Sequence, residues 1–332
     1  MKAILCEQFG PPEALVLADV PEPEPGRGQV AIDVRACGLN FPDVLMLEGK
    51  YQSRPDFPFS PGGELAGVVR SVGPQVSGFA PGDRVIARVG HGGLREQALA
   101  QAGRCVRMPD ALDFPPAAGL LLTYGTAYHA LADRAALTAG ETLVVLGAAG
   151  GVGLAAVELG KLMGARVIAG ASTKEKVDLA LSRGAEAGFV YPEGPLSREQ
   201  QRALSEMIKQ LTGGGADVMC DPVGGDYAEP ALRAMAWEGR YLVIGFAAGA
   251  IPSLPLNLLL LKGCDIRGVF YGELAVRDPD RNRQLLADLL TWAAEGRIAP
   301  HVSEEFPLAR AGEAICLLAD RRALGKVIVT IP

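Results

Sequence analysis

The first third of the chain alternates apolar with polar or small residues, at the period of half-buried β-strands. Val30, Ile32 and Val34 are each followed by a small or charged residue, so one face of this run suits a core and the other suits solvent. Residues 65–72 and 84–89 have a similar strand composition. Turns rich in Pro and Gly separate these runs, at Pro25-Gly26, Pro61-Gly62-Gly63, Val72-Gly73-Pro74 and Pro81-Gly82-Asp83. We therefore predict that residues 1–122 form a β-rich, partly open barrel.

From Thr123 onward the pattern changes to short apolar runs that alternate with helical periodicity. The predicted strands are 142–146, 166–170, 188–191, 217–220, 241–244 and 266–270. Ser172 with Glu175, and Ser197 with Gln200, have the spacing of capping boxes that open two of the intervening helices. Strands that alternate with helices in this way predict a doubly wound parallel sheet.

The last part of the chain combines a long helical pattern with a short closing strand. The helix begins at Asp278-Pro279 and carries an apolar stripe along 285–292. A further helix and a strand at 326–331 complete the tail, which we assign to the first domain. The predicted fold is α/β, with a β-rich domain at 1–122 and 271–332 and a Rossmann domain at 123–270.

Composition and charge narrow the class of protein. The 332 residues are enough for two cores. The net charge of −6, without a basic run, argues against nucleic acid or an anionic membrane as the main partner. The six cysteines are scattered without a Cys-x-x-Cys pair, as in a reduced cytosolic protein. Because no signal peptide or spanning apolar run is visible, we expect a cytoplasmic protein.

A glycine-rich turn follows the apolar run 142–146. Glycine gives such a turn its backbone freedom and lets a pyrophosphate approach where no Cβ blocks it. The N–H groups at the start of the next helix then hold the negative charge. The usual Gly-x-Gly-x-x-Gly spacing would need glycine where Ala148 stands. The order of strand, turn and helix nevertheless predicts a dinucleotide site, with contacts at Ala149, Gly150, Gly151, Val152 and Gly153.

The end of the second predicted strand, at 169–172, indicates which nicotinamide cofactor binds. A site for NAD usually carries Asp or Glu here to accept from the ribose 2′-OH, and this run carries neither. Ser172 and the N–H groups of the next helix can meet a 2′-phosphate instead, with Lys176 one turn further along. The alternative for Lys176 is a solvated surface lysine. We therefore predict NADPH as the cofactor.

Several runs together resemble one family. In chain order they are 37–43 (CGLNFPD), 61–64 (PGGE), 78–85 (GFAPGDRV), 123–129 (TYGTAYH), 147–153 (GAAGGVG) and 221–225 (DPVGG). The chain resembles the medium-chain dehydrogenase/reductase superfamily, in its zinc-free NADPH:quinone oxidoreductase branch, which includes the zeta-crystallins. The resemblance covers nearly the whole chain. It implies an N-terminal GroES-like domain, an inserted Rossmann domain and a nicotinamide cleft between them.

The same resemblance implies roles for particular residues. Asn40 and Tyr51 would line the substrate side. Strand 266–270 would join two Rossmann sheets edge to edge in a homodimer, which would cover an otherwise exposed sheet edge. The residues near the cofactor would be Thr126 at the nicotinamide amide, Gly245, Phe246, Phe270 and Tyr271 in the covering loops, and Tyr191 with Arg321 or Arg322 at the 2′-phosphate.

The positions that hold zinc in related dehydrogenases lack suitable ligands in this chain. Those relatives have a cysteine at the position of Asn40, a histidine at Gly63 and a third ligand near Ala118. We therefore predict no metal, and a hydride transfer from NADPH to a quinone or to the β-carbon of an activated alkene. The Tyr51 hydroxyl and the Asn40 amide are candidate donors to the developing oxyanion. The alternative is that both only shape the cleft.

Two other functions remain open from the sequence. One is reduction of an enoyl thioester, such as an acryloyl-type acyl-CoA, which a wide basic mouth would favour. The other is a non-enzymatic, NADPH-binding role, for which the acidic net charge disfavours RNA as the partner.

Overall fold

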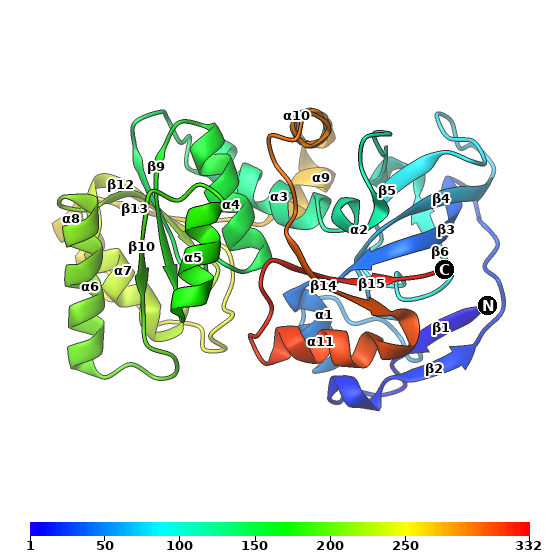
Figure 1. The fold of residues 1–332 in the computed structure, drawn as a ribbon, viewed down its shortest axis with the longest axis horizontal. Helices are drawn as coiled ribbons and strands as arrows, with labels where there is room; N and C mark the ends of the chain where they lie inside the picture. Colours follow the sequence, from blue (N-terminus) through cyan, green and yellow to red (C-terminus); the bar gives the residue numbers. More distant parts are fainter. The chain divides into compact units, whose positions relative to one another are not determined.

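The computed structural model describes all 332 residues, and contacts between them divide the chain into two units (Figure 1). Unit 1 comprises Met1–Leu122 and Asp288–Pro332, and unit 2 comprises Thr123–Ala287. Unit 2 therefore extends beyond residue 270, where the sequence pattern placed its end. The physical reason is that Tyr271, at the start of the segment after 270, is buried against Gly125 of unit 2, and that Arg281 further along pairs with Asp133 at 2.7 Å.

The strands of unit 1 form a seven-stranded sheet and a two-stranded sheet. The larger sheet has the order β14-β15-β3-β4-β5-β7, with β6 paired to β3. The strands are β1 (Lys2–Leu5), β2 (Val16–Asp19), β3 (Gln29–Gly38), β4 (Glu64–Val72), β5 (Arg84–Arg88), β6 (Gln97–Gln101), β7 (Cys105–Arg107), β14 (Val302–Pro307) and β15 (Lys326–Thr330). Because β15 pairs with β3, with Val329 opposite Cys37, the tail completes the sheet that the N-terminal strands begin.

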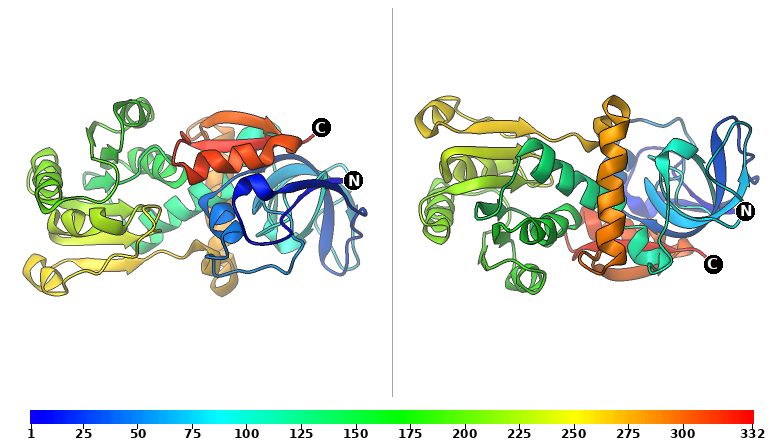
Figure 2. Two further views of the ribbon diagram at one scale, coloured as in Figure 1. Left: turned by 90° about the horizontal axis from the view of Figure 1, so that it is seen from below. Right: turned by 90° about the horizontal axis from the view of Figure 1, so that it is seen from above.

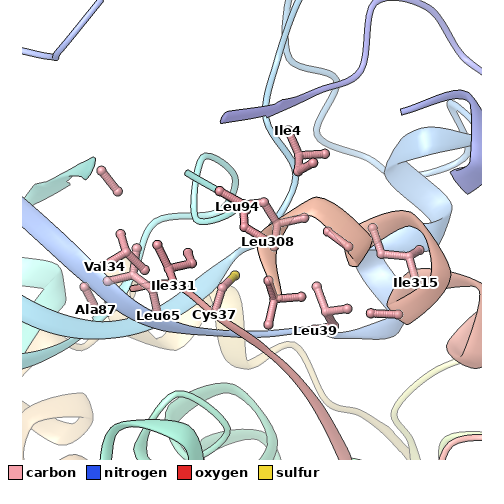
Figure 3. Close-up of a cluster of buried hydrophobic side chains, with 14 of the residues drawn as sticks. Ile4, Val34, Cys37, Leu39, Leu65, Ala87, Leu94, Leu308, Ile315 and Ile331 are labelled. Carbon is pink, nitrogen blue, oxygen red and sulfur yellow. The ribbon is translucent and has the colours of Figure 1, made fainter. Parts of the chain in front are cut away.

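The core of unit 1 joins residues from both ends of the chain. Figure 3 shows Val34, Cys37 and Leu65, from β3 and β4, in one cluster with Leu308 and Ile331 of the tail. The helical elements around this core are α1 (Phe41–Leu47), α2 (Phe114–Ala117), α11 (Ala311–Ala319) and the 3₁₀ turns η1 (Pro12–Ala14), η2 (Ala102–Arg104) and η5 (Leu308–Arg310). Burial of this cluster ties the tail to the β-rich domain, because apolar area removed from water stabilises the contact.

Unit 2 contains a six-stranded parallel sheet with the order β10-β9-β8-β11-β12-β13. Its strands are β8 (Thr142–Val145), β9 (Arg166–Ala171), β10 (Ala187–Val190), β11 (Ala216–Asp221), β12 (Met235–Val243) and β13 (Asp265–Gly268). The predicted doubly wound parallel sheet is confirmed. β12 begins earlier than predicted. Its first half contains the exposed Trp237 and has no continuous apolar run, so the hydrophobic pattern did not reveal it. β13 ends before Phe270, whose ring is 54% exposed.

Some helices of unit 2 lie between successive strands of this sheet in the chain, and others precede its first strand or follow its last. They are α3 (Leu121–Tyr128), the π-helical η3 (His129–Arg134), α4 (Gly151–Leu162), α5 (Lys174–Ser182), α6 (Arg198–Thr212), η4 (Gly225–Tyr227), α7 (Ala228–Arg233), α8 (Asn257–Lys262), α9 (Tyr271–Arg277) and α10 (Pro279–Ala294). Helix α10, orange in the right view of Figure 2, carries the chain from unit 2 back into unit 1. No helix combines the length and the apolar character that crossing a membrane requires.

The two predicted capping boxes have different outcomes. The box at Ser197 is confirmed, since its hydroxyl accepts from Gln200 N and the Gln200 side chain accepts from Ser197 N. The box at Ser172 is wrong. Thr173 is the N-cap of α5 and its Oγ1 accepts from Lys176 N at 3.2 Å. Thr173 has the extended backbone that an N-cap needs, so the helix begins one residue later and the Ser172 hydroxyl does not cap it.

Candidate functional site

The glycine-rich turn lies at the carboxyl edge of the parallel sheet, between β8 and α4. Strand β8 pairs with β9 on one side and with β11 on the other. The order of the strands along the sheet therefore reverses beside β8. In open parallel sheets, ligands bind outside the carboxyl ends of the strands at such a switch point. The fold thus positions this turn where a dinucleotide would bind.

The backbone of the turn explains its glycines. Gly147 has a φ of 59°, a left-handed conformation that favours glycine. A Cβ on Gly153 would lie 2.1 Å from the carbonyl oxygen of Gly147, so only glycine lets α4 pack this closely on the turn. Ala148 is fully buried, so its methyl group occupies the interior and not the ligand side. This accounts for the departure from the usual glycine spacing.

The start of α4 offers unused hydrogen-bond donors. Gly150 is its N-cap, and no side chain caps the helix. The first N–H groups of a helix have no partner inside the helix, and the helix dipole adds positive potential there. The N–H of Gly150 already donates to Gly147 O at 2.9 Å, so the N–H groups of Ala149, Gly151, Val152 and Gly153 are the candidate donors to the pyrophosphate of a dinucleotide.

Two residues at the carboxyl ends of β10 and β11 brace this turn. Tyr191, after β10, accepts a hydrogen bond from Gly147 N at 3.2 Å, and burial raises the pKa of its hydroxyl. Asp221 ends β11 and accepts from Val223 N at 2.7 Å and from Gly224 N at 2.9 Å. Burial also raises the pKa of Asp221. The sequence run 221–225 carried the resemblance without a stated role, and the structure shows that Asp221 shapes the loop beside the turn.

Ser172 and Lys176 come together at the carboxyl end of β9. The Lys176 ammonium donates to Ser172 Oγ at 3.1 Å. No acidic residue lies along 169–172. A hydroxyl and a cation adjacent to a helix start are suited to hold a phosphate monoester.

The loops after β12 and β13 place their aromatic rings differently. The rings of Phe246, beside Gly245, and of Phe270 are partly exposed, so they can cover a ligand. The Tyr271 side chain is buried, and a Cβ on Gly125 would lie 2.4 Å from its ring. Tyr271 therefore packs on α3 directly beside Thr126, and its contact with the cofactor stays a prediction.

Asn40 is the N-cap of α1 in unit 1 and is almost fully buried. Its Nδ2 donates to Gly38 O at 3.1 Å and to Glu64 Oε2 at 3.3 Å. Its Oδ1 accepts from the Lys326 ammonium at 2.7 Å. Both amide hydrogens thus have acceptors within the chain, so the side chain is already committed to this network.

The charges around Asn40 form a buried network of one ammonium and two carboxyl groups. Lys326 Nζ also donates to Leu39 O at 2.8 Å and lies 3.6 Å from Glu64 Oε2. Burial lowers the pKa of Lys326, which Glu64 opposes. Asp43 accepts from the backbone N–H groups of Asn40 and Gly62, and burial raises its pKa to about 6. Sequence reasoning missed this network because Lys326 is remote in the chain.

The zinc-ligand positions of related dehydrogenases do not fit a zinc ion in this chain. No group of three or more His, Cys, Asp or Glu side chains could hold a metal. Asn40 bonds to an ammonium, which has no free electron pair for a metal. Ala118 and Gly63 contribute no side-chain donor, and a Cβ on Gly63 would lie 3.0 Å from Gly90 O.

Tyr51 lies in the loop after α1 and differs from Asn40 in having a free hydroxyl. The ring is half-buried against the unit 1 core. Its hydroxyl makes no hydrogen bond within the chain, and burial raises its pKa. Arg321 and Arg322 lie in the exposed turn after α11, also in unit 1. Their contact with a 2′-phosphate stays a prediction.

Comparison with known proteins decides the family. Residues 26–110 match the alcohol dehydrogenase GroES-like domain, and residues 151–292 match the domain described as zinc-binding dehydrogenase. The chain is 38% identical over 333 residues to the quinone oxidoreductase-like protein 2 homolog of Nematostella vectensis, covering 99% of this chain and 88% of that protein. The chain belongs to the quinone oxidoreductase branch of the medium-chain dehydrogenase/reductase superfamily.

Solved structures of this oxidoreductase family have the same fold. The quinone oxidoreductase from Thermus thermophilus, also solved in its complex with NADPH, has a TM-score of 0.84 and 36% identity over 99% of this chain and 100% of that chain. The Escherichia coli quinone oxidoreductase complexed with NADPH has a TM-score of 0.89 and 27% identity over 99% and 100% of the two chains. The resemblance and the combination of GroES-like and Rossmann folds are thereby confirmed.

Proposed function

We propose that this family member transfers a hydride from NADPH to a quinone or an activated alkene, without a metal ion. The observation that carries the proposal is the uncapped helix start at 149–153, placed at the switch point of the parallel sheet. The complexes of related quinone oxidoreductases with NADPH support the choice of cofactor. A panel of quinones, alkenals, enones and acyl-CoA thioesters, assayed for NADPH consumption, tests the proposal and ranks the acceptors.

The Ser172–Lys176 pair makes the cofactor preference testable. Lys176→Ala should weaken NADPH binding by roughly 10- to 150-fold, because it removes one charge-assisted contact to the 2′-phosphate. Binding of NADH should hardly change. Lys174→Ala is the matched control, since Lys174 pairs with Asp178 at 2.6 Å on the same helix. Equal losses for both cofactors in Lys176→Ala would show that this lysine supports the fold and not the phosphate.

The acceptor oxygen gains negative charge as the hydride arrives, and the protein must stabilise that charge. NADPH, when bound, supplies the hydride with its two electrons. The sequence suggested two donors, the Tyr51 hydroxyl and the Asn40 amide. Of these, only the Tyr51 hydroxyl has no hydrogen-bond partner in the chain. Asn40 is held by Lys326 and Glu64, so its proposed role is to fix the loop that ends in Tyr51.

Tyr51→Phe removes this hydroxyl and keeps the ring. Loss of one preorganised donor can lower kcat by about 100- to 1,000-fold, and the loss should be larger for an enone than for a quinone. The reason is that an enolate concentrates charge on one oxygen, whereas a quinone anion delocalises it. Steady-state kinetics with both acceptors measure the difference. An equal loss of kcat for both acceptors, or a change in KM alone, would show that Tyr51 only lines the site and does not donate to the oxyanion.

An exposed apolar patch supports a homodimer through the edge of the unit 2 sheet. Helix α8 exposes Leu260 and Leu261, and its N-cap Leu256 is exposed as well; Leu260 is 82% exposed. The helix leads into the edge strand β13. Trp237, on the neighbouring strand β12, is 72% exposed. Contiguous apolar surface of this kind marks protein interfaces, and an edge strand offers unpaired backbone groups.

Leu260→Asp should convert the dimer into a monomer at micromolar concentration, because it places a charge inside the proposed interface. Light scattering of the wild type and the variant measures the change. Leu181→Asp, on α5 and outside this patch, is the control and should remain dimeric. A wild-type protein that is monomeric at this concentration contradicts the proposed assembly.

A further inference from the structure

We infer that a pocket in unit 1 binds an anionic group, a carboxylate or a phosphate, carried by the substrate. This inference deepens the proposed function and rests on it. It means that, among the acceptors proposed above, the physiological one carries an acidic group, as an organic acid or a phosphate-bearing thioester does. The pocket begins two residues after Tyr51 in the same loop, so it adjoins the residue proposed to meet the acceptor.

The pocket has the size and lining of a site for a small organic ligand. Its volume is 510 Å³, within the usual range for ligand pockets. Pro55, Pro58 and Phe59 give it an apolar wall, and Arg54, His91 and Arg95 give it a basic side. This combination suits an organic molecule with an acidic end.

Neither arginine of the pocket has an acidic partner. Arg54 and Arg95 take part in no ion pair, although Asp56 also lines the pocket. The Nε atom of Arg95 is buried and makes no hydrogen bond. A buried donor without an acceptor is unfavourable, and buried polar groups in proteins are rarely left so. A carboxylate or phosphate oxygen would satisfy it, with the fork geometry that arginine offers to both groups.

The walls of the pocket are held in place by backbone hydrogen bonds. Gly92 N donates to Ser60 O at 2.7 Å, and Leu94 N donates to Pro61 O at 3.0 Å. Leu94 is anchored in the core, as Figure 3 shows, directly before Arg95. The segment that carries Arg95, which also forms an isolated bridge with Ala3, is thus fixed before a ligand arrives, which lowers the cost of binding.

His91 adds a neutral donor to the basic side. Burial and the neighbouring Arg95 lower the pKa of His91, so at neutral pH the ring is uncharged and one of its nitrogens can donate to an anion. The positive charge of the pocket therefore comes from the two arginines, and Arg95 is the one that a substitution should test first.

Matched pairs of acceptors separate the two sources of the anion. β-Acetylacrylate and its methyl ester are enones that differ in one carboxylate, and crotonyl-4′-phosphopantetheine and crotonyl-pantetheine differ in one phosphate. Arg95→Met should raise KM by about 10-fold or more for the charged compound of one pair and leave KM for the uncharged compound of that pair unchanged. The pair that responds shows whether the anion in the pocket is a carboxylate or a phosphate. Arg95→Lys should recover part of the loss, because it restores the charge.

Arg104→Met, which removes an exposed arginine of unit 1 outside the pocket, is the control and should change neither member of a pair. If Arg95→Met does not fold, Arg54→Met takes its place. Equal changes for charged and neutral members, or no change for either charged member, overturn the inference.

A binding measurement keeps the inference separate from the proposed function. Calorimetric titration of β-acetylacrylate and of free CoA into protein saturated with NADP⁺ measures the affinity of each anion for the pocket in the absence of turnover. One of the two anions should bind, and Arg95→Met should weaken it by about 10-fold or more. Binding that depends on Arg95 without any reductase activity would refute the proposed function alone. Reduction of neutral quinones without Arg95-dependent anion binding would refute the pocket alone.

Discussion

Gly153→Ala is expected to remove NADPH binding and to destabilise unit 2. The added Cβ would lie 2.1 Å from Gly147 O and 2.9 Å from Ala148 Cα. These are backbone atoms that cannot rotate away, so α4 must shift from the turn. Overpacking of this kind costs about 1–3 kcal/mol of stability. A displacement of the donors by about 1 Å can lower kcat/KM by about 100-fold.

The matched control for this variant is Gly103→Ala. A Cβ on Gly103 would meet no atom within 4 Å, so stability should stay within about 0.5 kcal/mol of the wild type. Titration of each variant with NADPH, followed by fluorescence of the nicotinamide, measures the effect. NADPH affinity close to the wild-type value in Gly153→Ala would show that the cofactor does not depend on the start of α4.

Lys326→Met is expected to cost about 3–5 kcal/mol of unfolding free energy, because it leaves buried carboxyl groups without their cation. The Lys326 ammonium bonds to Leu39 O and Asn40 Oδ1 and lies 3.6 Å from Glu64. The substitution keeps most of the side-chain volume. Asn40 should then lose its fixed orientation, and the Tyr51 loop with it. Urea denaturation measures the stability.

Two further variants separate the buried charge from other effects of this change. Lys50→Met removes a lysine that is 69% exposed and paired with Glu48, and it should cost no more than about 1 kcal/mol. Combining Lys326→Met with Glu64→Gln should recover part of the loss, because no uncompensated charge remains at that position. Equal stability of Lys326→Met and Lys50→Met would contradict the account of the network.

The sequence predicted the sheet of unit 2 because buried parallel strands are almost wholly apolar. The run 142–146 is of this kind, and all of its residues are buried. The hydrophobic pattern missed the first half of β12, around Trp237, because an exposed strand does not have a continuous apolar run. It also placed the N-cap of α5 one residue early, since Ser172 and Thr173 are both good N-caps and only the backbone conformation distinguishes them.

The residues of the candidate site were easier to predict than their partners. The uncapped glycine turn and the Ser172–Lys176 pair depend on local spacing, which the sequence shows. The hydrogen bonding of the Asn40 side chain depends on Lys326, which is 286 residues away in the sequence. Lys326 comes close because β15 pairs with β3. The pocket around Arg95 likewise joins two loops that are separate in the sequence. Such contacts follow from tertiary pairing and have no local signature.

The central claim is that the protein carries out hydride transfer from NADPH without a metal ion. Its most direct test is the rate of NADPH oxidation with a simple quinone by protein that has been treated with a strong chelator and shown to contain no stoichiometric zinc. We expect the full rate of untreated protein, with one NADPH consumed for each quinone reduced. Loss of this activity on chelation and its return with added zinc, or no quinone-dependent oxidation at all, would contradict the account.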